Sequence, residues 1–178
     1  MGDISGLLKV RVVKGTRLAV RDIRSSDPYV VLKLGDQVVK TRVINSNLNP
    51  VWDEELTLTI SATTPRTLRV EVFDKDTFSA DDAMGEAEID LQPLAASVRI
   101  RKVLKGVSTA TQVRKLVPSK ENCLAKDSGI HYVDGTMIQD MCLRLRNVES
   151  GELEMQLKWV DLPASASASA GLQPQHSY

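Results

Sequence analysis

The fold is decided by residues 68–91, which read 68-LRVEVFDKDTFSADDAMGEAEIDL-91. Apolar and polar side chains alternate over residues 68–73 and again over residues 85–91, which is the period expected of half-buried β-strands. Between these two runs lie four aspartates: Asp74, Asp76, Asp81 and Asp82. The stretch therefore predicts two β-strands joined by an acidic loop.

The same alternation recurs along most of the chain. It predicts six further strands, at residues 7–13, 29–34, 38–43, 55–61, 138–148 and 152–160. Short turn segments separate some of these runs, among them residues 35–37 and 149–151. Eight strands, frequent turn signals and almost no helical periodicity predict an all-β protein with an eight-stranded antiparallel β-sandwich.

Two segments interrupt this pattern. Residues 92–137 are too long for a turn inside a compact domain, so we expect an insert with structure of its own before the last two strands. Within it, residues 98–104 and 112–117 fit two strands, or a strand and a helix, equally well. Residues 164–178, an Ala-Ser run followed by Gly, Gln and Pro, predict a disordered tail. Residues 1–163 are then expected to form a single domain.

The composition excludes several classes of protein. The chain has 178 residues, 42% of them hydrophobic, which is enough for one domain with a core. Its 23 basic residues balance its 23 acidic ones, so a general nucleic-acid binder is not expected. The charge is unevenly placed, because residues 71–90 hold eight acids and one lysine, while residues 91–120 hold seven bases and no acid.

Targeting signals are weak. No apolar run reaches the roughly 18–20 residues of a membrane-spanning helix, and the first residues do not resemble a secretory signal. Gly2 lacks the Ser or Thr at position 6 that N-myristoylation requires. Cys123 and Cys142 are expected to be free thiols in a reducing cytosol. We therefore expect a soluble intracellular protein that meets membranes only at their surface.

A second acidic segment, 21-RDIRSSDPYV-30, resembles the loop of residues 74–82 in its placement before a strand. Ca²⁺ takes six to eight oxygen ligands, and clustered carboxylates repel one another unless a cation lies between them. An EF-hand is excluded, because a loop starting at Asp74 would place Ser79 and Gly85 where Gly and Glu are needed. The alternative is that these aspartates are ordinary loop formers.

Three motifs, 26-SDPYV-30, 48-LNPVWDE-54 and 74-DKD-76 with 82-DAMG-85, resemble the signature of the C2 domain. The resemblance covers residues 6–91 and 138–162 and implies a Ca²⁺ site. The implied ligands are the side chains of Asp22, Asp27, Asp74, Asp76 and Asp82 and the backbone carbonyls of Arg21 and Lys75. Asp81 is the alternative to Asp82. The last strand, 151-GELEMQLKW-159, is similar to the one that opens the other C2 topology, which implies the circularly permuted type II arrangement.

The insert and the last strands resemble a narrower group. The segments 117-VPS-119, 122-NCLA-125, 143-LRLRNVE-149 and 157-LKWVDLP-163 are similar to the plant C2-domain abscisic-acid-related family, also labelled small GTPase-activating proteins. This resemblance implies calcium-dependent binding of anionic phospholipid membranes and recruitment of abscisic acid receptors. The alternative it implies is activation of a partner GTPase. The expected location is the cytoplasm, with the plasma membrane as a calcium-dependent peripheral site and the nucleus as a further compartment.

Lipid contacts are expected at two places. Ile23 and Phe78 stand at the tips of the two acidic loops, where an apolar side chain either inserts into lipid or folds back on its own loop. Lys33, Lys40 and Arg42 alternate on neighbouring strands and would form a basic patch on the concave face, or an ordinary solvated sheet face.

Catalysis is not expected, because the sequence has neither a Gly-x-Ser-x-Gly elbow nor a Gly-rich phosphate loop. Arg99, Arg101 and Lys102 in the basic insert are candidate partner-binding residues. The alternative role for the insert is to cap exposed sheet edges.

Overall fold

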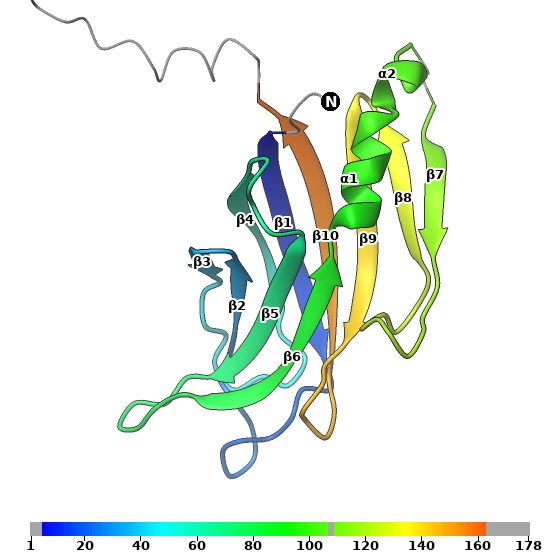
Figure 1. Cartoon of the computed structure of the whole chain (residues 1–178). Helices are drawn as coiled ribbons and strands as arrows, with labels where there is room; N and C mark the ends of the chain where they lie inside the picture. Colours follow the sequence, from blue (N-terminus) through cyan, green and yellow to red (C-terminus); the bar gives the residue numbers. More distant parts are fainter. Residues whose placement is uncertain (1–4, 107–108, 163–178) are drawn as a thin grey trace, which may run out of the picture.

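The structure, a computed structural model, describes residues 5–106 and 109–162, which form two antiparallel sheets packed face to face (Figure 1). The first sheet has the order β4-β1-β10-β9-β8-β7, and the second has the order β3-β2-β5-β6. The strands are β1 (Gly6–Thr16), β2 (Pro28–Leu34), β3 (Gln37–Lys40), β4 (Val51–Ile60), β5 (Thr67–Asp74), β6 (Asp82–Asp90), β7 (Thr111–Leu116), β8 (Ser128–Val133), β9 (Thr136–Arg144) and β10 (Glu152–Asp161). The helices are α1 (Gln92–Arg99) and α2 (Arg101–Leu104).

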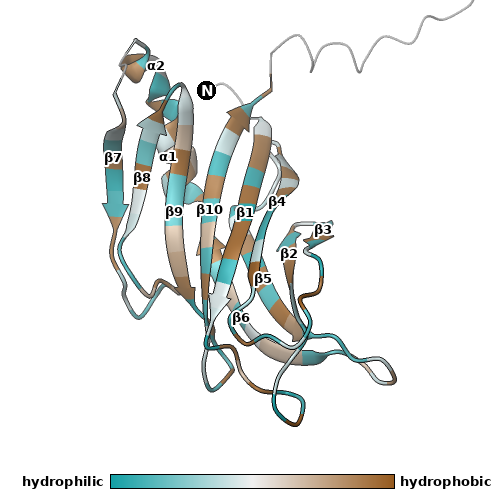
Figure 2. Ribbon diagram, turned by 180° about the vertical axis from the view of Figure 1, so that it is seen from behind, coloured by the Kyte–Doolittle hydropathy of each residue, from teal (hydrophilic) through white to brown (hydrophobic). Residues whose placement is uncertain are grey.

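The alternation seen in the sequence sets which side chains face inward. Along β1 and β10, buried apolar residues alternate with partly exposed polar ones, and Figure 2 shows the resulting stripes. Val10 of β1 lies opposite Leu157 of β10 and Leu56 of β4. This register places one apolar face of the first sheet against the second sheet, as a two-layer sandwich requires.

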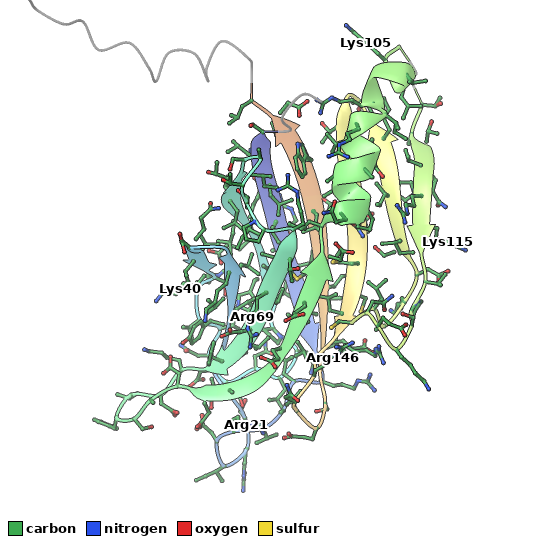
Figure 3. All side chains as sticks on the ribbon, in the orientation of Figure 1. Arg21, Lys40, Arg69, Lys105, Lys115 and Arg146 are labelled. Carbon is green, nitrogen blue, oxygen red and sulfur yellow. The ribbon has the colours of Figure 1, made fainter. Side chains whose placement is uncertain are left out.

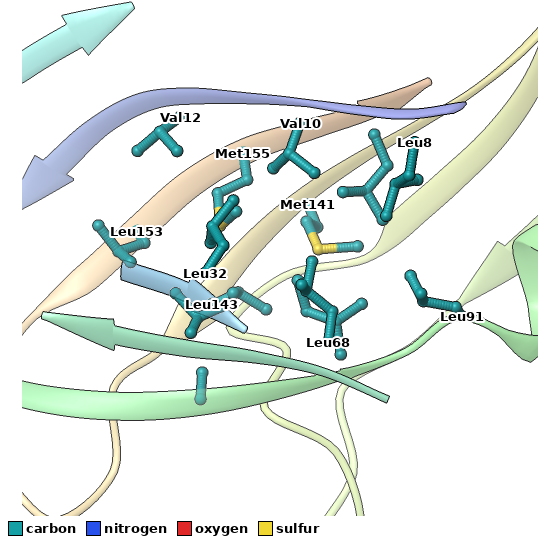
Figure 4. Close-up of a cluster of buried hydrophobic side chains, with 14 of the residues drawn as sticks. Leu8, Val10, Val12, Leu32, Leu68, Leu91, Met141, Leu143, Leu153 and Met155 are labelled. Carbon is teal, nitrogen blue, oxygen red and sulfur yellow. The ribbon is translucent and has the colours of Figure 1, made fainter. Parts of the chain in front are cut away.

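The core lies between the two sheets. Leu8, Val10 and Val12 of β1 face Leu32 of β2 and Leu68 of β5 across it (Figure 4). All five side chains are fully buried, and burying each aliphatic side chain contributes about 1.5–3 kcal/mol. The packed core therefore holds the strands in position, and the acidic loops begin at the ends of these strands.

The chain order of the strands agrees with the type II expectation. The last strand, β10, pairs along its whole length with the first, β1, from Gly6 opposite Asp161 to Thr16 opposite Glu152. Beyond the end of β9, Arg146 makes two backbone hydrogen bonds with Glu86 of β6, which join the two sheets. The first and last strands thus lie side by side in the middle of one sheet.

All eight predicted strands are present, but the described residues contain ten strands because the insert adds β7 and β8. Residues 98–104 are helical rather than extended. Pro93 occupies the first turn of α1, and Leu94, Ala95 and Val98 bury one face of it. Figure 1 shows α1 lying over β9.

Several predicted boundaries are wrong: β1 ends at Thr16, β4 begins at Val51 and β6 begins at Asp82, so these strands are longer than predicted, and two other strands are shorter. The strand predicted at 38–43 ends at Lys40, because the Thr41 hydroxyl accepts the Val30 N–H and donates to the Arg42 carbonyl, which replaces ladder hydrogen bonds. The strand predicted at 138–148 ends at Arg144, where the chain leaves for β6. The tail predicted at 164–178 lies outside the described residues. Within the described part, neither helix has the length and apolar character needed to cross a membrane.

Candidate metal centre

Three loops meet at one end of the sandwich, at the bottom of Figure 1. Loop A (residues 17–27) joins β1 to β2, loop B (residues 75–81) joins β5 to β6, and loop C (residues 145–151) follows β9. Loops A and B are close because Pro28, at the start of β2, lies opposite Asp74, at the end of β5. The sheet register thus brings together two acidic segments that are about fifty residues apart in the chain.

Three carboxylates gather between loops A and B. Asp22, Asp74 and Asp76 each place one oxygen within 4.8 Å of the other two. Two oxygens bound to one Ca²⁺ at 2.3–2.6 Å lie no more than about 5 Å apart, so this spacing suits a single ion. The group is therefore a candidate cation site made of side chains that the sequence analysis named.

Asp74 carries the strongest indication of a cation. Its side chain is fully buried, and its Oδ1 accepts the backbone N–H of Asp27 at 2.7 Å. Its Oδ2 is also buried and has no hydrogen-bond partner among the described residues. Burial raises the pKa of Asp74, the Asp27 N–H lowers it, and the charges of Asp22, Asp76 and Asp27 raise it further. A buried carboxylate oxygen without a donor, beside other acids, is chemically suited to a metal ion.

Asp82, unlike Asp81, has its carboxyl group directed at that of Asp76, although neither residue is one of the three grouped carboxylates. Desolvation and then the adjacent carboxyl group of Asp82 raise the pKa of Asp76, with smaller contributions from Asp22 and Asp81. The carboxylate of Asp81 is held elsewhere, because it accepts the hydroxyl of Tyr29 and, at 2.9 Å, the backbone N–H of Asp76. The sequence left the choice between the two aspartates open, and the hydrogen bonds of Asp81 leave Asp82 the more available of the two.

The contact between Tyr29 and Asp81 fixes the shape of loop B. Tyr29 stacks on Phe73, with ring centroids 5.8 Å apart. Burial and the hydrogen bond to Asp81 raise the pKa of Tyr29 to about 12. The same hydrogen bond lowers the pKa of Asp81. Asp81 therefore stabilises loop B through Tyr29 and the backbone of Asp76, and it is not one of the three grouped carboxylates.

Asp27 and the segments around it hold loop A in place. The Asp27 carboxylate accepts the Ser46 N–H at 2.7 Å, and its carbonyl accepts the Lys75 N–H at 2.9 Å. The Arg21 N–H donates to the buried hydroxyl of Ser26. Asp27 is thus next to the carboxylate group and already bonded to the backbone on both sides.

The side chain of Arg21, which lies at the loop end in Figure 3, joins loop A to loop C. Its guanidinium donates to both carboxylate oxygens of Glu149, at 2.6 and 3.1 Å, and to the Ala83 carbonyl at 3.0 Å. The hydrogen bond from Arg21 lowers the pKa of Glu149 to about 2. The sequence analysis assigned Arg21 only a backbone role, and this ion pair adds a structural one.

The two apolar loop tips project into solvent. The side chain of Phe78 is 100% exposed, and that of Ile23 is 98% exposed. Neither side chain folds back onto its own loop. Both tips lie on the loops that carry the three carboxylates.

The basic patch predicted from Lys33, Lys40 and Arg42 also contains acidic residues, which pair with two of these three side chains. Lys33 and Lys40 do share the outer face of the second sheet, through the cross-strand pairs Lys33–Val38 and Val31–Lys40. Lys33 pairs with Glu71 at 3.1 Å, however, and Arg42, which lies beyond the end of β3, donates to the Trp52 carbonyl and lies 3.5 Å from Glu54. Lys40 makes no ion pair among the described residues.

The candidate partner-binding residues lie on the helices of the insert. Arg99 is an exposed residue in the last turn of α1, and Arg101 forms an ion pair with Asp161 of β10. Lys102 lies in α2. These residues are at the opposite end of the sandwich from loops A, B and C (Figure 1).

Tyr29, Ser46 and Glu149 were missed by the sequence analysis, although each holds a residue of the site. Their partners lie 19 to 128 residues away in the chain. A single sequence contains no local signal for such contacts, because they depend on strand pairing and loop packing.

Comparison with known proteins agrees with this architecture. The sequence pattern of the C2 domain matches residues 6–105. "GTPase activating protein 1" of Oryza sativa subsp. japonica is 53% identical over 165 residues, which cover 93% of this chain and 98% of that protein. "Protein C2-DOMAIN ABA-RELATED 4" of Arabidopsis thaliana is 50% identical, covering 93% of this chain and 92% of that protein.

Two solved structures are similar in fold. A C2 domain of plant Extended Synaptotagmin 1 has a TM-score of 0.59 and 22% identity, covering 89% of this chain and 96% of that one. The calcium-bound pair of C2 domains from Extended-Synaptotagmin 2 has a TM-score of 0.57 and 25% identity. There the match covers 88% of this chain and 46% of the longer, two-domain chain.

Proposed function

Because this chain belongs to the C2 domain family, and within it to the plant C2-domain ABA-related and GTPase activating proteins, we propose that it binds anionic phospholipid membranes in a calcium-dependent manner and recruits abscisic acid receptors to them. The observation that carries the proposal is the group formed by Asp22, Asp74 and Asp76, with the unpartnered Oδ2 of Asp74 inside it. Asp82 and Asp27, together with the carbonyls of Arg21 and Lys75, are the remaining ligands that family resemblance implies.

Calcium would act on membrane binding through charge. Without a cation, the carboxylates at this end repel an anionic membrane surface, and a bound Ca²⁺ offsets that charge. Each charge near an anionic membrane changes the free energy of binding to that membrane by about 1 kcal/mol. A change in the sign of the net charge on these loops is therefore enough to control attachment.

The exposed loop tips would add an apolar contribution. Ile23 and Phe78 project from the same loops as the carboxylates. Once calcium brings the loops to the membrane, burial of Phe78 among acyl chains contributes about 1.5–3 kcal/mol. Charge would then control attachment, and the apolar tips would prolong it.

Sedimentation with vesicles of phosphatidylserine and phosphatidylcholine, with and without Ca²⁺, tests the proposal. The wild-type chain should sediment only with calcium and anionic lipid. The double variant Asp74→Ala/Asp76→Ala should stay in the supernatant in both conditions. Asp36→Ala/Glu121→Ala is the matched control, because it removes the same charge from exposed positions outside loops A, B and C. Calcium-dependent sedimentation of the Asp74→Ala/Asp76→Ala variant would refute the assignment.

Receptor recruitment is a separate step with its own test. An abscisic acid receptor added to the same vesicles should sediment only when this chain and calcium are present. Reversing the charge at Arg99, Arg101 and Lys102 should reduce receptor capture without changing sedimentation of the chain itself. Equal receptor capture by this variant at low salt would exclude the insert helices as the docking surface.

GTPase activation is the second candidate function, favoured by the name of the rice relative with 53% identity. The chain would then act through a partner's catalytic site by presenting an arginine rather than by catalysing a reaction itself. Arg99 suits this role best among the arginines of the helices, because it is exposed and Arg101 is paired with Asp161. Stimulated GTP turnover by a partner GTPase that is lost in Arg99→Ala would support this function.

A further inference from the structure

A cavity of about 460 Å³ lies between the insert and the open edge of the second sheet, well away from the carboxylate group. Its walls come from residues 88–90 of β6, Pro93 of α1, residues 114–119 and 122–124 of the insert, and the inner face of β9. We call it the insert cavity. Most of its wall is apolar, including Leu116, Leu124 and Met141, and its volume falls within the range of small-molecule sites.

Gln139 supplies an unsatisfied polar atom in the wall of this cavity. Its side chain lines the cavity but is only 1% exposed, and its Oε1 has no hydrogen-bond partner among the described residues. Its Nε2 donates to the hydroxyl of Ser128 at 3.1 Å. That hydroxyl donates its own proton to the Asp140 carbonyl at 2.6 Å, so it can only accept from Gln139. This arrangement fixes the orientation of the amide and leaves Oε1 as the unpaired acceptor.

A basic side chain lies on the same inner face. Arg114 of β7 is opposite Ile130 of β8, and Ile130 is opposite Gln139 of β9. Residues paired in this way share one face of a sheet, so Arg114 and Gln139 are separated by two strand spacings, about 10 Å. Arg114 is exposed and Gln139 is buried, which places the arginine at the mouth and the amide at the inner end.

The other charged residues of the cavity wall already have partners. Lys115, labelled on β7 in Figure 3, lies 3.4 Å from Asp127. Glu88 lies 3.9 Å from Arg69, and Asp90 accepts the Gln92 N–H at 2.9 Å. Among the described residues, Arg114 makes no ion pair. Arg114 is therefore the cation on this wall that a ligand carboxylate can meet, while Asp90, held by a backbone N–H, keeps its negative charge.

We propose that the insert cavity binds a small amphipathic organic acid. The apolar body of this ligand lies between β9 and the insert, a hydroxyl or N–H group at its inner end donates to Gln139 Oε1, and its carboxylate meets Arg114 at the mouth. The two polar groups of the ligand are separated by about the distance of two strands, which selects a rigid, elongated molecule over a compact one.

Calorimetric titration of the full chain with two probes tests the proposal. The first probe is a hydroxynaphthoic acid whose hydroxyl and carboxyl groups lie at opposite ends of the ring system, and the second is the naphthoic acid without the hydroxyl. The chain should bind the first probe at one site, with Kd below about 1 mM. It should bind the second about five- to tenfold more weakly, since a buried hydrogen bond is lost. Titration without calcium and without lipid keeps the result independent of the proposed membrane function.

Three variants locate the site. Gln139→Met should remove the preference for the hydroxyl probe, and Arg114→Gln should weaken both acids, whereas Lys105→Gln should not. Val117→Trp should block both probes by filling the mouth, while the control Val103→Trp on α2 should bind normally. Both valines are more than half exposed, so these two variants report on the cavity even if Gln139→Met does not fold.

Several results would overturn the proposal. They are equal affinity for the two probes, a retained preference in Gln139→Met, unchanged binding in Val117→Trp, and Kd values above about 1 mM for both acids. Equal affinity in a chain that does bind would show that a water molecule or a neighbouring side chain satisfies Gln139.

Discussion

Replacing Asp74 by asparagine should make the chain more stable without calcium and less stable with it. The substitution preserves shape and keeps an oxygen that can accept the Asp27 N–H, which now binds Oδ1 at 2.7 Å. It removes a fully buried negative charge that lies near Asp22 and Asp76. Since the unpartnered Oδ2 becomes an amide that can donate to its neighbours, the cost of burying this group also falls.

The size of the effect follows from the spacing of the carboxylates. Two like charges 4.8 Å apart, the upper limit of the spacing here, repel by about 1 kcal/mol in water and about 3 kcal/mol at an effective dielectric constant of 20. For a domain of this length, about 1–3 kcal/mol raises the melting temperature by about 2–10 °C. Calcium at a thousand times its Kd stabilises the wild-type chain by about 4.1 kcal/mol, which exceeds this gain, and should have no such effect on the variant.

Differential scanning calorimetry in EDTA and in saturating Ca²⁺, at low ionic strength, measures both effects. The melting temperature of Asp74→Asn should exceed that of the wild type in EDTA and fall below it in calcium, while Asp36→Asn should match the wild type in both. A variant less stable than the wild type in EDTA would show that Asp74 is a structural hydrogen-bonding group rather than a strained ligand. A calcium-dependent rise in the variant equal to that of the wild type would place the ion elsewhere.

Three further predictions concern residues around this centre and beyond it. Phe78→Ala should weaken calcium-dependent vesicle binding by about ten- to hundredfold in sedimentation assays while leaving calcium affinity in solution unchanged, because the exposed ring does not contact the carboxylates; an equal loss of both would mean that the ring shapes loop B. Tyr29→Phe should lower the melting temperature by about 2–6 °C with or without calcium, since Asp81 loses the hydroxyl it accepts, and an unchanged melting curve would contradict a supporting role for that contact. Burial and then Glu152 raise the pKa of the Cys142 thiol, so alkylation by iodoacetamide at pH 8 should be slower than for a free cysteine and should accelerate in Glu152→Gln; equal rates in the two chains would rule out the influence of Glu152.

The strands of the sandwich could be predicted because their signal is local. Each strand with one buried face shows alternation within its own residues, as β5 and β6 do. The insert could not be resolved in this way. Val98-Arg99-Ile100-Arg101 alternates like a strand, yet α1 forms because Leu94, Ala95 and Val98 pack together on β9 and Pro93 suits a first helical turn. Tertiary packing thus overrode a local pattern that was only four residues long.

The candidate ligands could be named from the resemblance to the C2 domain, but the choice between Asp81 and Asp82 could not. These neighbours differ only in which way their side chains turn, and that direction depends on Tyr29, which is 52 residues away. Tyr29 reaches Asp81 because it is paired with Phe73 across β2 and β5. The direction in which Asp81 turns is therefore set by sheet register, which emerges only when the strands are assembled.

The excess of acids in residues 71–90 serves two different purposes. Three of the acids, Glu71, Glu86 and Glu88, lie on the outer face of the second sheet around Arg69, with ion-pair distances of 2.8, 2.5 and 3.9 Å. Strand periodicity assigns these to a solvated face, where Arg69 and Lys33 offset part of their charge. The aspartates of loop B and its ends have no such cation, apart from Lys75 beside Asp81 at 3.8 Å. A local surplus of acids in a sequence therefore overstates a metal site, because some of these acids belong to a sheet face and only the aspartates at the loops form a carboxylate group suited to a cation.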